Sequence, residues 1–447
     1  MLVDAAAYFR RLANALEAAE RSILILGWDF DHRIRLEPPN GPRLGDLLRS
    51  LAEARPELRI RILIWSLAPI HGPGSATALL FGARWHDHPR IEVKLDRTHL
   101  FYACHHQKIV CIDDTVGFVG GMDLTVGRWD NRLHAISNRR RIDPEGTYYP
   151  PMHDVQMVLV GEAARDVARV ARERWLRATG EAIALPQSSV APLSADGPGD
   201  FAEIPIAIAR GASVATGDAP SQEVAALTLD CIAAARRWLY IETQYLTSQL
   251  VGEALARSLS APTGPEILIV LTRRSAGFME HLVMSENRDR LQRMLQKADR
   301  HHRLRCYYPV VPGPKGPREI KVHSKVMIVD DRLLRVGSAN LNNRSMHLDS
   351  ECDLALEARQ PAERRRIAEI RNRLLAEHLG AAPERIAAIL AETGSLFAVV
   401  ERLNHGPRGL RSFGHVAAPG PTRPLPFTWL LDPSHPIGRR YDSAGGS

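Results

Sequence analysis

The chain repeats one short pattern of residues at a fixed distance along its sequence. His106 and His323 lie 217 positions apart, and the same offset brings six further residues onto identical ones. The matching sets are His106, Lys108, Asp113, Asp114, Val119, Gly120 and Leu124, and His323, Lys325, Asp330, Asp331, Val336, Gly337 and Leu341. Seven identities without a gap indicate an internal duplication. The chain is therefore expected to fold as two similar halves.

Short apolar runs alternate with helical patterns in both halves, which is typical of an α/β fold with buried strands. In the first half, strands are predicted at residues 22–28, 59–65, 91–95, 107–113 and 154–160. In the second half, they are predicted at residues 237–246, 266–272, 305–310, 324–330 and 351–358. The order of strands and helices recurs, so both halves are expected to share one α/β fold.

The composition between and after the repeats predicts the domain boundaries. Residues 185–201 are rich in Pro, Ser and Gly, which is typical of a linker. They separate a first half at residues 1–184 from a second half at residues 202–404. Residues 405–447 are rich in Pro and Gly and are predicted to form an irregular tail.

Charge and composition narrow the class of protein. The net charge of +7 favours anionic partners, which include nucleic acid, acidic lipid surfaces and phosphate esters. The 5 cysteines have no C-x-x-C spacing, so neither disulfides nor a zinc site are expected, and a reducing compartment is the default. The sequence has no uncharged apolar run of about 18 residues, and its first segment reads as an amphipathic helix. We expect a cytoplasmic or peripheral membrane protein, and export without a signal peptide stays open.

Within each repeat, a histidine and a lysine stand two residues apart at the start of an apolar strand. Because side chains alternate between the two faces of a strand, His106 and Lys108 are expected to share one face. Asp113 and Asp330, seven residues after each histidine, are expected to face away. We interpret these two aspartates as structural groups that bind backbone or an arginine behind the sheet.

The segments VGG and VGS that follow are interpreted as tight glycine turns. They contain Gly120 and Gly121 in the first repeat, and Gly337 and Ser338 in the second. Backbone in such turns can approach an anion closely and offer it N–H groups. Beyond the second turn, Asn340 supplies an amide donor. A histidine, a lysine, exposed backbone and an amide make half of a phosphate site, and two facing copies would complete it.

The full pattern is H-x-K-x-x-x-x-D followed by six residues and G-[GS]-x-[ND], and it occurs twice. It resembles the signature of the phospholipase D superfamily, and the resemblance covers most of residues 20–380. The resemblance implies a duplicated α/β/α sandwich, whose halves are related by a pseudo-twofold axis with both histidines in one cleft. It also implies that no cofactor or metal takes part. HDH at residues 86–88 and HH at residues 301–302 lack further ligands at zinc-like spacing, so no metal site is expected there.

The resemblance implies a role for each histidine. His106 would attack the phosphodiester phosphorus and form a covalent phosphohistidine. His323 would protonate the leaving alcohol and then activate the incoming water or alcohol. Two histidines that titrate near neutral pH can divide these roles between them.

Five further residues receive roles from the same resemblance. Lys108, Lys325 and Asn340 would hold the non-bridging phosphate oxygens as charge develops. Asp154 and Glu351 open the strand that follows each repeat, and they would orient the two histidines through their other ring nitrogens.

The first repeat departs from the second at one position. The duplication pairs Asn340 with Asp123, and an anion beside a phosphate is unfavourable. In eukaryotic-type phospholipases D the first motif often reads GG-x-D followed by GRWD, as in GGMDLTVGRWD here. Asp123 therefore indicates that branch and receives no catalytic role. Trp129 and Asp130 have two readings, a border of a pocket for a cationic head group or a buried packing position.

Together these features predict a phospholipase D that hydrolyses the distal phosphodiester of a glycerophospholipid such as phosphatidylcholine, with transfer to alcohols. The expected protein is a monomer that touches the membrane surface and does not bind nucleic acid. One alternative is a nuclease of the same superfamily, which the positive charge would suit. Others are a phosphatidyltransferase, such as a cardiolipin or phosphatidylserine synthase, and a binding protein with an inactive site. Intact His, Lys and Asp in both repeats disfavour the last.

Overall fold

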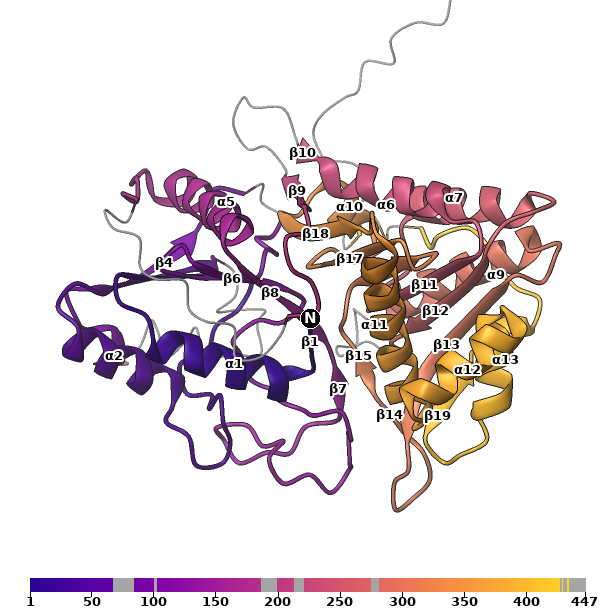
Figure 1. Cartoon of the computed structure of the whole chain (residues 1–447), viewed down its shortest axis with the longest axis horizontal. Helices are drawn as coiled ribbons and strands as arrows, with labels where there is room; N and C mark the ends of the chain where they lie inside the picture. Colours follow the sequence, from indigo (N-terminus) through magenta and orange to yellow (C-terminus); the bar gives the residue numbers. More distant parts are fainter. Residues whose placement is uncertain are drawn as a thin grey trace, which may run out of the picture.

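The computed structural model describes residues 1–66, 84–99, 103–185, 199–212, 221–274, 281–426, 428 and 432–433. The two halves of the sequence form two groups of strands and helices that lie side by side (Figure 1). This arrangement confirms the expected α/β fold with two similar halves.

The first half is built on a seven-stranded sheet with the order β1-β8-β6-β5-β2-β3-β4. Its strands β2, β3 and β4 are parallel, and the pairs from β2 through β5, β6 and β8 to β1 are antiparallel. The strands are β1 (Leu2–Val3), β2 (Ser22–Gly27), β3 (Arg59–Trp65), β4 (Ile91–Asp96), β5 (Ile109–Ile112), β6 (Val116–Gly120) and β8 (Val155–Val160).

The second sheet repeats this order as β9-β18-β17-β16-β11-β12-β13, with β10 and β14 at its ends. The strands are β9 (Ile206–Ala212), β10 (Ser221–Gln222), β11 (Trp238–Thr243), β12 (Glu266–Leu271), β13 (Leu304–Val311), β14 (Arg318–Glu319), β16 (Val326–Val329), β17 (Leu333–Gly337) and β18 (Glu351–Glu357). An additional strand, β19 (Gly409–Ser412), pairs with β13. This strand lies in the segment for which the sequence predicted an irregular tail.

Helices cover both faces of each sheet. In the first half, α1 (Ala5–Glu17) and α2 (Leu44–Ala54) pack on one face, and α5 (Glu162–Thr179) packs on the other. In the second half, α6 (Glu223–Ala234), α7 (Gln249–Ser260) and α9 (Glu286–Ala298) pack on the outer face. The inner face carries α11 (Pro361–Leu379), α12 (Pro383–Thr393) and α13 (Leu396–Leu403). Short helical segments are η1 (Arg84–His86), η2 (His281–Ser285), α10 (Asn343–His347) and η3 (Gly414–Ala417).

Local sequence explains the ends of α11, the helix that lies near the junction of the halves in Figure 1. Pro361 occupies its first turn, where the missing N–H costs nothing, and Glu363 bonds back to the backbone of Gln360 as a capping box. The helix ends at Gly380, whose φ of 64° is left-handed and favours glycine.

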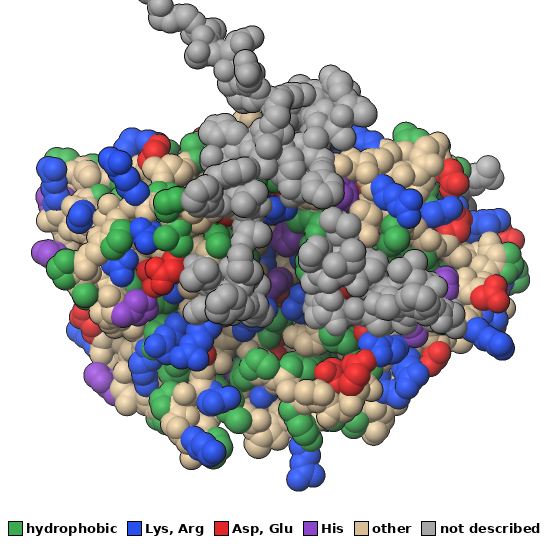
Figure 2. Space-filling model, turned by 180° about the vertical axis from the view of Figure 1, so that it is seen from behind, with side chains coloured by type: hydrophobic (Ala, Val, Ile, Leu, Met, Phe, Trp, Pro, Cys, Tyr) green, Lys and Arg blue, Asp and Glu red, His purple; other side chains and the backbone are tan. Residues whose placement is uncertain are grey.

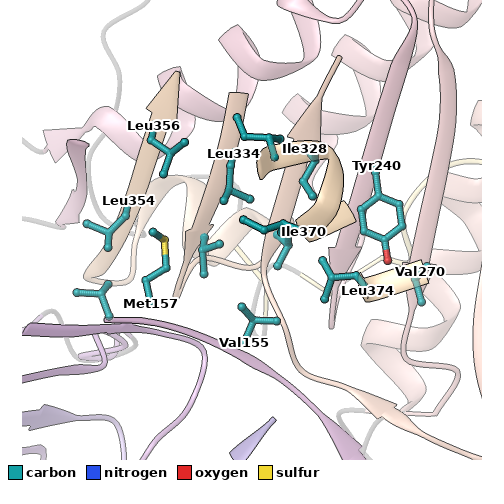
Figure 3. Close-up of a cluster of buried hydrophobic side chains, with 14 of the residues drawn as sticks. Val155, Met157, Tyr240, Val270, Ile328, Leu334, Leu354, Leu356, Ile370 and Leu374 are labelled. Atoms are coloured by element: carbon teal, nitrogen blue, oxygen red, sulfur yellow. The ribbon is translucent and has the colours of Figure 1, made fainter. Parts of the chain in front are cut away.

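The two halves share one hydrophobic core. Met157 of β8 lies beside Leu354 of β18, and Val155 of β8 lies below Ile370 and Leu374 of α11 in the view of Figure 3. These side chains come from both halves and all have at most 6% exposure. Burial of apolar surface across this boundary holds the halves in one orientation. None of the described helices combines the length and apolar composition that crossing a bilayer requires.

Candidate active site

Two short parallel backbone pairings join the halves next to the repeated motifs. Strand β15 (Lys321–Val322) pairs in parallel with β7 (Met152–His153), and His323 N then donates to His153 O at 2.8 Å. At the equivalent place, His106 N donates to Ser350 O at 2.9 Å. Each repeated histidine therefore runs alongside the segment that precedes the predicted carboxylate of the other half.

This crossing pairs each histidine with a carboxylate from the opposite half. Nδ1 of His106 lies 2.9 Å from both carboxylate oxygens of Glu351. Nδ1 of His323 lies 2.7 Å from Oδ2 of Asp154. The carboxylates are buried, while the histidine side chains keep 15% and 7% exposure. With Nδ1 engaged, Nε2 of each ring is the nitrogen left for chemistry. Histidine side chains are visible near the middle of the face drawn in Figure 2.

The two lysines lie close to these pairs but differ in their partners. Lys108 Nζ donates to the carbonyl of His106 at 3.2 Å and lies 3.0 Å from Oδ2 of Asp123. Lys325 Nζ lies 3.1 Å from Nδ1 of His323 and also donates to its carbonyl. A buried carboxylate thus balances the charge of Lys108 directly, whereas the carboxylate beside Lys325 is already bound to a histidine.

The surroundings lower the pKa of both imidazoles. Burial is the largest cause that holds the pKa of His106 well below its usual value, followed by the charges of Lys108 and Lys325. Burial likewise lowers the pKa of His323, followed by the charges of Lys325 and Arg128. A neutral imidazole has a lone pair available on one nitrogen, which is the form that a nucleophile or general base needs.

The partners of the histidines have shifted pKa values as well. Burial raises the pKa of Glu351 to about 8, opposed by a hydrogen bond from Ser338. It also raises the pKa of Asp154, opposed by the charge of Lys325. Burial lowers the pKa of Lys325 to about 7, opposed by Asp154. The site thus disfavours isolated charges of either sign, and a phosphodiester anion would favour the protonated forms of its basic groups.

The VGG and VGS segments are not glycine turns, which corrects the sequence interpretation. Gly120 and Gly337 end the buried strands β6 and β17, and neither residue has a positive φ. The N–H of Gly121 donates to Val155 O at 3.2 Å, so it is not free for an anion. A Cβ at Gly121 would overlap the carboxylate of Asp154. Glycine is needed here because Asp154 occupies the space of a side chain.

The other glycine positions follow the same logic. A Cβ at Gly120 would overlap Gln156, and one at Gly337 would overlap Asp353. Ser338 takes the place equivalent to Gly121 and uses its side chain, because its hydroxyl donates to Glu351 and accepts from Cys352 N at 3.0 Å. Close packing against Asp154 and Gln156 in the first half, and against Asp353 in the second, therefore accounts for the glycines of both segments.

Asp113 and Asp330 bind backbone at the far end of the strands. Asp113 accepts from the N–H groups of Glu20, Arg21 and Ser22, each at 2.7 Å. Asp330 accepts from the corresponding N–H groups of residues 236, 237 and 238 at 2.7 to 2.8 Å. Each aspartate starts a hairpin turn with a positive φ, 51° in both cases, which aspartate tolerates better than most residues. Asp113 thereby holds the start of strand β2, and Asp330 holds the start of strand β11.

Asp123 and Asn340 occupy matching positions with different contacts. Asp123 accepts from Trp28 N at 2.8 Å besides its ion pair with Lys108. Burial would raise the pKa of Asp123, but Lys108 is the main charge that holds it below its usual value. Asn340 is 3% exposed, and its Oδ1 has no hydrogen-bond partner among the described residues. Asp123 therefore binds the lysine and backbone of its own half, whereas Oδ1 of Asn340 accepts no hydrogen bond from the described residues.

Glu242 binds two residues that are adjacent in sequence to the pair formed by His323 and Asp154. Its carboxylate accepts from His153 Nε2 at 3.0 Å and from Ser324 Oγ at 2.7 Å, and these residues precede Asp154 and follow His323. It also accepts from the hydroxyl of Tyr240 at 2.5 Å. Sequence patterns do not reveal these contacts of Glu242, because its partners lie far apart in the chain.

The GRWD segment and His105 are buried. Trp129 is 7% exposed and lies under Arg140, with 5.8 Å from the guanidinium carbon to the ring centre. Asp130 binds Arg141 at 2.9 Å. Arg128 was missed by the sequence reasoning, although its charge acts on His323 and Asp154. His105 is fully buried, with Nδ1 3.3 Å from Asp96, and is a core residue.

The family described as Phospholipase D matches residues 15–198 and 281–393, which is more than half of the chain. The chain belongs to the phospholipase D family. Both repeated motifs lie within the matched ranges, so the sequence resemblance is confirmed.

Curated relatives extend the match across most of the chain. Phospholipase D1 of Schizosaccharomyces pombe is 25% identical over 85% of this chain and 35% of its own length. Phospholipase D A of Dictyostelium discoideum is 25% identical over 86% of this chain and 36% of its own length. The chain therefore spans about a third of the length of these phospholipases D.

A solved structure shares the fold of this phospholipase D family member. The phosphatidylserine synthase of Haemophilus influenzae Rd KW20 aligns with a TM-score of 0.56 at 15% identity. The alignment covers 90% of this chain and 95% of the synthase, so it includes both halves.

Proposed function

We propose that the protein is a phospholipase D that hydrolyses the distal phosphodiester bond of a glycerophospholipid such as phosphatidylcholine. The products are phosphatidic acid and the free head group. The observation that carries this proposal is the pair of histidines, 106 and 323, each bound through Nδ1 to a carboxylate of the other half. Two such pairs supply the two proton-handling groups that a double displacement at phosphorus requires.

In the first step, Nε2 of His106 attacks the phosphorus and forms an N–P bond. The P–O bond to the head group breaks, and Nε2 of His323, which takes up a proton when the phosphodiester anion binds, gives that proton to the departing oxygen. Glu351 steadies the positive charge that develops on His106, and Asp154 holds the ring of His323 in position. Lys108, Lys325 and Asn340 bind the non-bridging oxygens.

In the second step, water attacks the phosphohistidine. Nε2 of His323 now accepts a proton from the water, the new P–O bond forms, and the N–P bond to His106 breaks. Phosphatidic acid leaves and both rings return to their starting state. An alcohol in place of water gives a phosphatidyl ester by the same steps, so the enzyme also catalyses transphosphatidylation.

The substrate class implies contact with a membrane surface, because the scissile bond lies in the head-group layer of a bilayer. The net charge of +7 suits a membrane surface that contains acidic lipids. Both members of each pair lie in one chain, so the proposed enzyme acts as a monomer.

Phosphatidyl transfer to a physiological alcohol is the second candidate. Its support is the fold likeness to the phosphatidylserine synthase over both halves. The chemistry differs from hydrolysis only in the acceptor of the second step, so the acceptor preference distinguishes the two functions.

The test incubates the protein with phosphatidylcholine vesicles in the presence of butanol, of L-serine, and of neither. We expect phosphatidic acid in water and phosphatidylbutanol with butanol. Both products should vanish in His106→Asn and persist in His301→Asn, a control at an exposed histidine. Product with serine in preference to water would favour the transferase. A parallel incubation with plasmid DNA tests the nuclease alternative, and DNA cleavage without lipid turnover would overturn the proposal.

The assignment of the nucleophile has its own test. A phosphatidylcholine labelled in the phosphate group is mixed with the enzyme and quenched within the first turnover. The label should reside on the peptide that contains His106. Label on the His323 peptide would reverse the two roles.

A further inference from the structure

Four ionisable side chains gather at the boundary of the halves, and the proposed reaction uses none of them. Asp4, His134 and His153 belong to the first half, and Glu377 belongs to α11 of the second. The first three are completely buried and Glu377 is 4% exposed. One oxygen or nitrogen atom from each residue lies within 4.8 Å of the corresponding atoms of the other three.

These donor atoms form a closed ring. Oε1 of Glu377 lies 2.8 Å from His153 Nδ1 and 3.1 Å from His134 Nε2. Asp4 closes the ring from the other side, with Oδ1 3.1 Å from His153 Nδ1 and Oδ2 3.6 Å from His134 Nε2. Neighbouring atoms of the ring are 2.8 to 3.6 Å apart, and one atom from each residue lies within 4.8 Å of the other three. This spacing suits an ion with bonds of about 2.0 to 2.2 Å after a small contraction.

The second nitrogen of each histidine is held by a further carboxylate. His134 Nδ1 lies 2.9 Å from Asp130, and His153 Nε2 lies 3.0 Å from Glu242. Histidines that bind metals commonly donate their other N–H to a carboxylate, which fixes the tautomer and makes the free nitrogen more basic. Both rings are thus oriented with the remaining nitrogen toward the centre of the ring of donors.

Asp4 provides an independent sign that a ligand belongs in the centre. Its Oδ2 is buried and has no hydrogen-bond partner among the described residues. The residue stands at the N-cap position of α1, yet its side chain does not cap the helix. Its φ of 63° is in the left-handed region, which costs a non-glycine residue free energy. An unsatisfied carboxylate oxygen in a buried, strained position is unfavourable unless a cation compensates it.

We propose that Asp4, His134, His153 and Glu377 bind one Zn²⁺ ion that joins the two halves. Two imidazole nitrogens and two carboxylate oxygens match the ligand types and the fourfold coordination of zinc. The site is closed on all sides by buried ligands, so the ion is structural and takes no part in catalysis. Protons on the two imidazoles can hold the same ring together when the ion is removed, so the metal-free protein stays folded but is less stable.

The test begins with the unaltered protein, freed of any affinity tag and purified without chelators. Elemental analysis should find about one zinc per chain, and another metal at that stoichiometry would overturn the zinc assignment. After exhaustive chelation, addition of ZnCl₂ should raise the melting temperature by about 3 to 5 °C, while MgCl₂ should not. These readouts do not depend on enzymatic activity, so they stay valid if the proposed function fails.

Variants locate the ion. His134→Gln and the nearly isosteric Asp4→Asn should each lose the bound zinc and the melting-temperature response to ZnCl₂. His301→Gln, at an exposed histidine of the HH pair, and His323→Asn, at the active site, should retain both. Absence of stoichiometric metal in the unaltered protein, together with no response to ZnCl₂, would overturn the proposal. Protons on the imidazoles would then be what holds the four side chains together. Zinc that persists in both Asp4→Asn and His134→Gln would place the ion elsewhere.

Discussion

His106 and Glu351 belong to different halves of the chain, yet Nδ1 of the histidine lies 2.9 Å from both oxygens of the carboxylate. His323 and Asp154 form the reciprocal pair at 2.7 Å. The two proton-handling groups therefore each depend on both halves, and the contacts between the halves hold the catalytic geometry.

The crossed pair predicts a severe effect of a nearly isosteric change. Glu351→Gln keeps the size of the side chain but removes the carboxyl group that pairs with Nδ1 of His106 and can ionise as the imidazolium develops, so kcat should fall by about 10² to 10⁴-fold. The measurement is release of head group from phosphatidylcholine vesicles, with melting temperature as a check on folding. Glu357→Gln, at the exposed end of the same strand, should keep full activity. Activity within a factor of two in Glu351→Gln would contradict the orienting role.

The buried lysine of the second repeat predicts a limb in the pH profile. Burial lowers the pKa of Lys325 to about 7, so this lysine loses its positive charge as pH rises through that value. Because the charged form binds phosphate, kcat/KM should decline above about pH 7. A bound phosphodiester favours the charged form, so the decline in kcat should lie at higher pH. A kcat/KM profile that stays flat to pH 9 would contradict the expected loss of activity when Lys325 loses its charge.

The backbone anchor at Asp113 predicts lost stability with little lost activity. Asp113→Asn tolerates the same positive φ, but its amide nitrogen cannot accept the N–H groups that the carboxylate binds. We expect a loss of about 2 kcal/mol in the free energy of unfolding, measured by urea denaturation. The value of kcat for the folded protein should change by less than about twofold, since the residue faces away from the histidines. Asp166→Asn, on the exposed side of α5, is the control.

The packing of glycine against carboxylate predicts the effect of adding one methyl group. Gly121→Ala would push the carboxylate of Asp154 away from His323, so kcat should fall by about 10²-fold. Gly414→Ala adds the same methyl group in open space and should have no effect on kcat. Equal activity of the two variants would show that Asp154 can shift without harm.

Glu242 is expected to act through its neighbours. Glu242→Gln weakens the bonds from His153 and Ser324, which adjoin Asp154 and His323 in the chain. We expect kcat to fall by about 10-fold with KM unchanged, because the residue does not touch substrate. Tyr240→Phe removes one of the other hydrogen bonds to Glu242 and should have a smaller effect. A rise in KM without a change in kcat would point to a role in substrate binding.

Much of the fold could be predicted from the sequence because it depends on local patterns. The predicted strand at residues 59–65 coincides with β3, and the one at residues 266–272 exceeds β12 by one residue. Strands β6 and β17 were missed because their glycines resemble turns, although those glycines serve close packing in the sheet. The duplication itself was visible as identities at one offset.

The sequence predicted which residues form the site, but not how they pair. Alternation along the predicted strand places His106 and Lys108 on one face, but it cannot say which half supplies a carboxylate to the ring. The exchange of carboxylates follows from the way the halves pair, as in the parallel pairing of β7 with β15. These strands are two residues long and have no sequence signature. The cluster of Asp4, His134, His153 and Glu377 was missed for the same reason, since chain folding alone brings these residues together.

The exchange of carboxylates between the halves has a consequence for how such a chain can evolve. A duplicated unit is usually free to diverge in one copy while the other preserves the original activity. Here the removal of either copy takes one member from both pairs, so no copy retains a working remnant. Selection must therefore act on the two copies together. A substitution that damages a pair in one copy could be compensated by a substitution in the other copy.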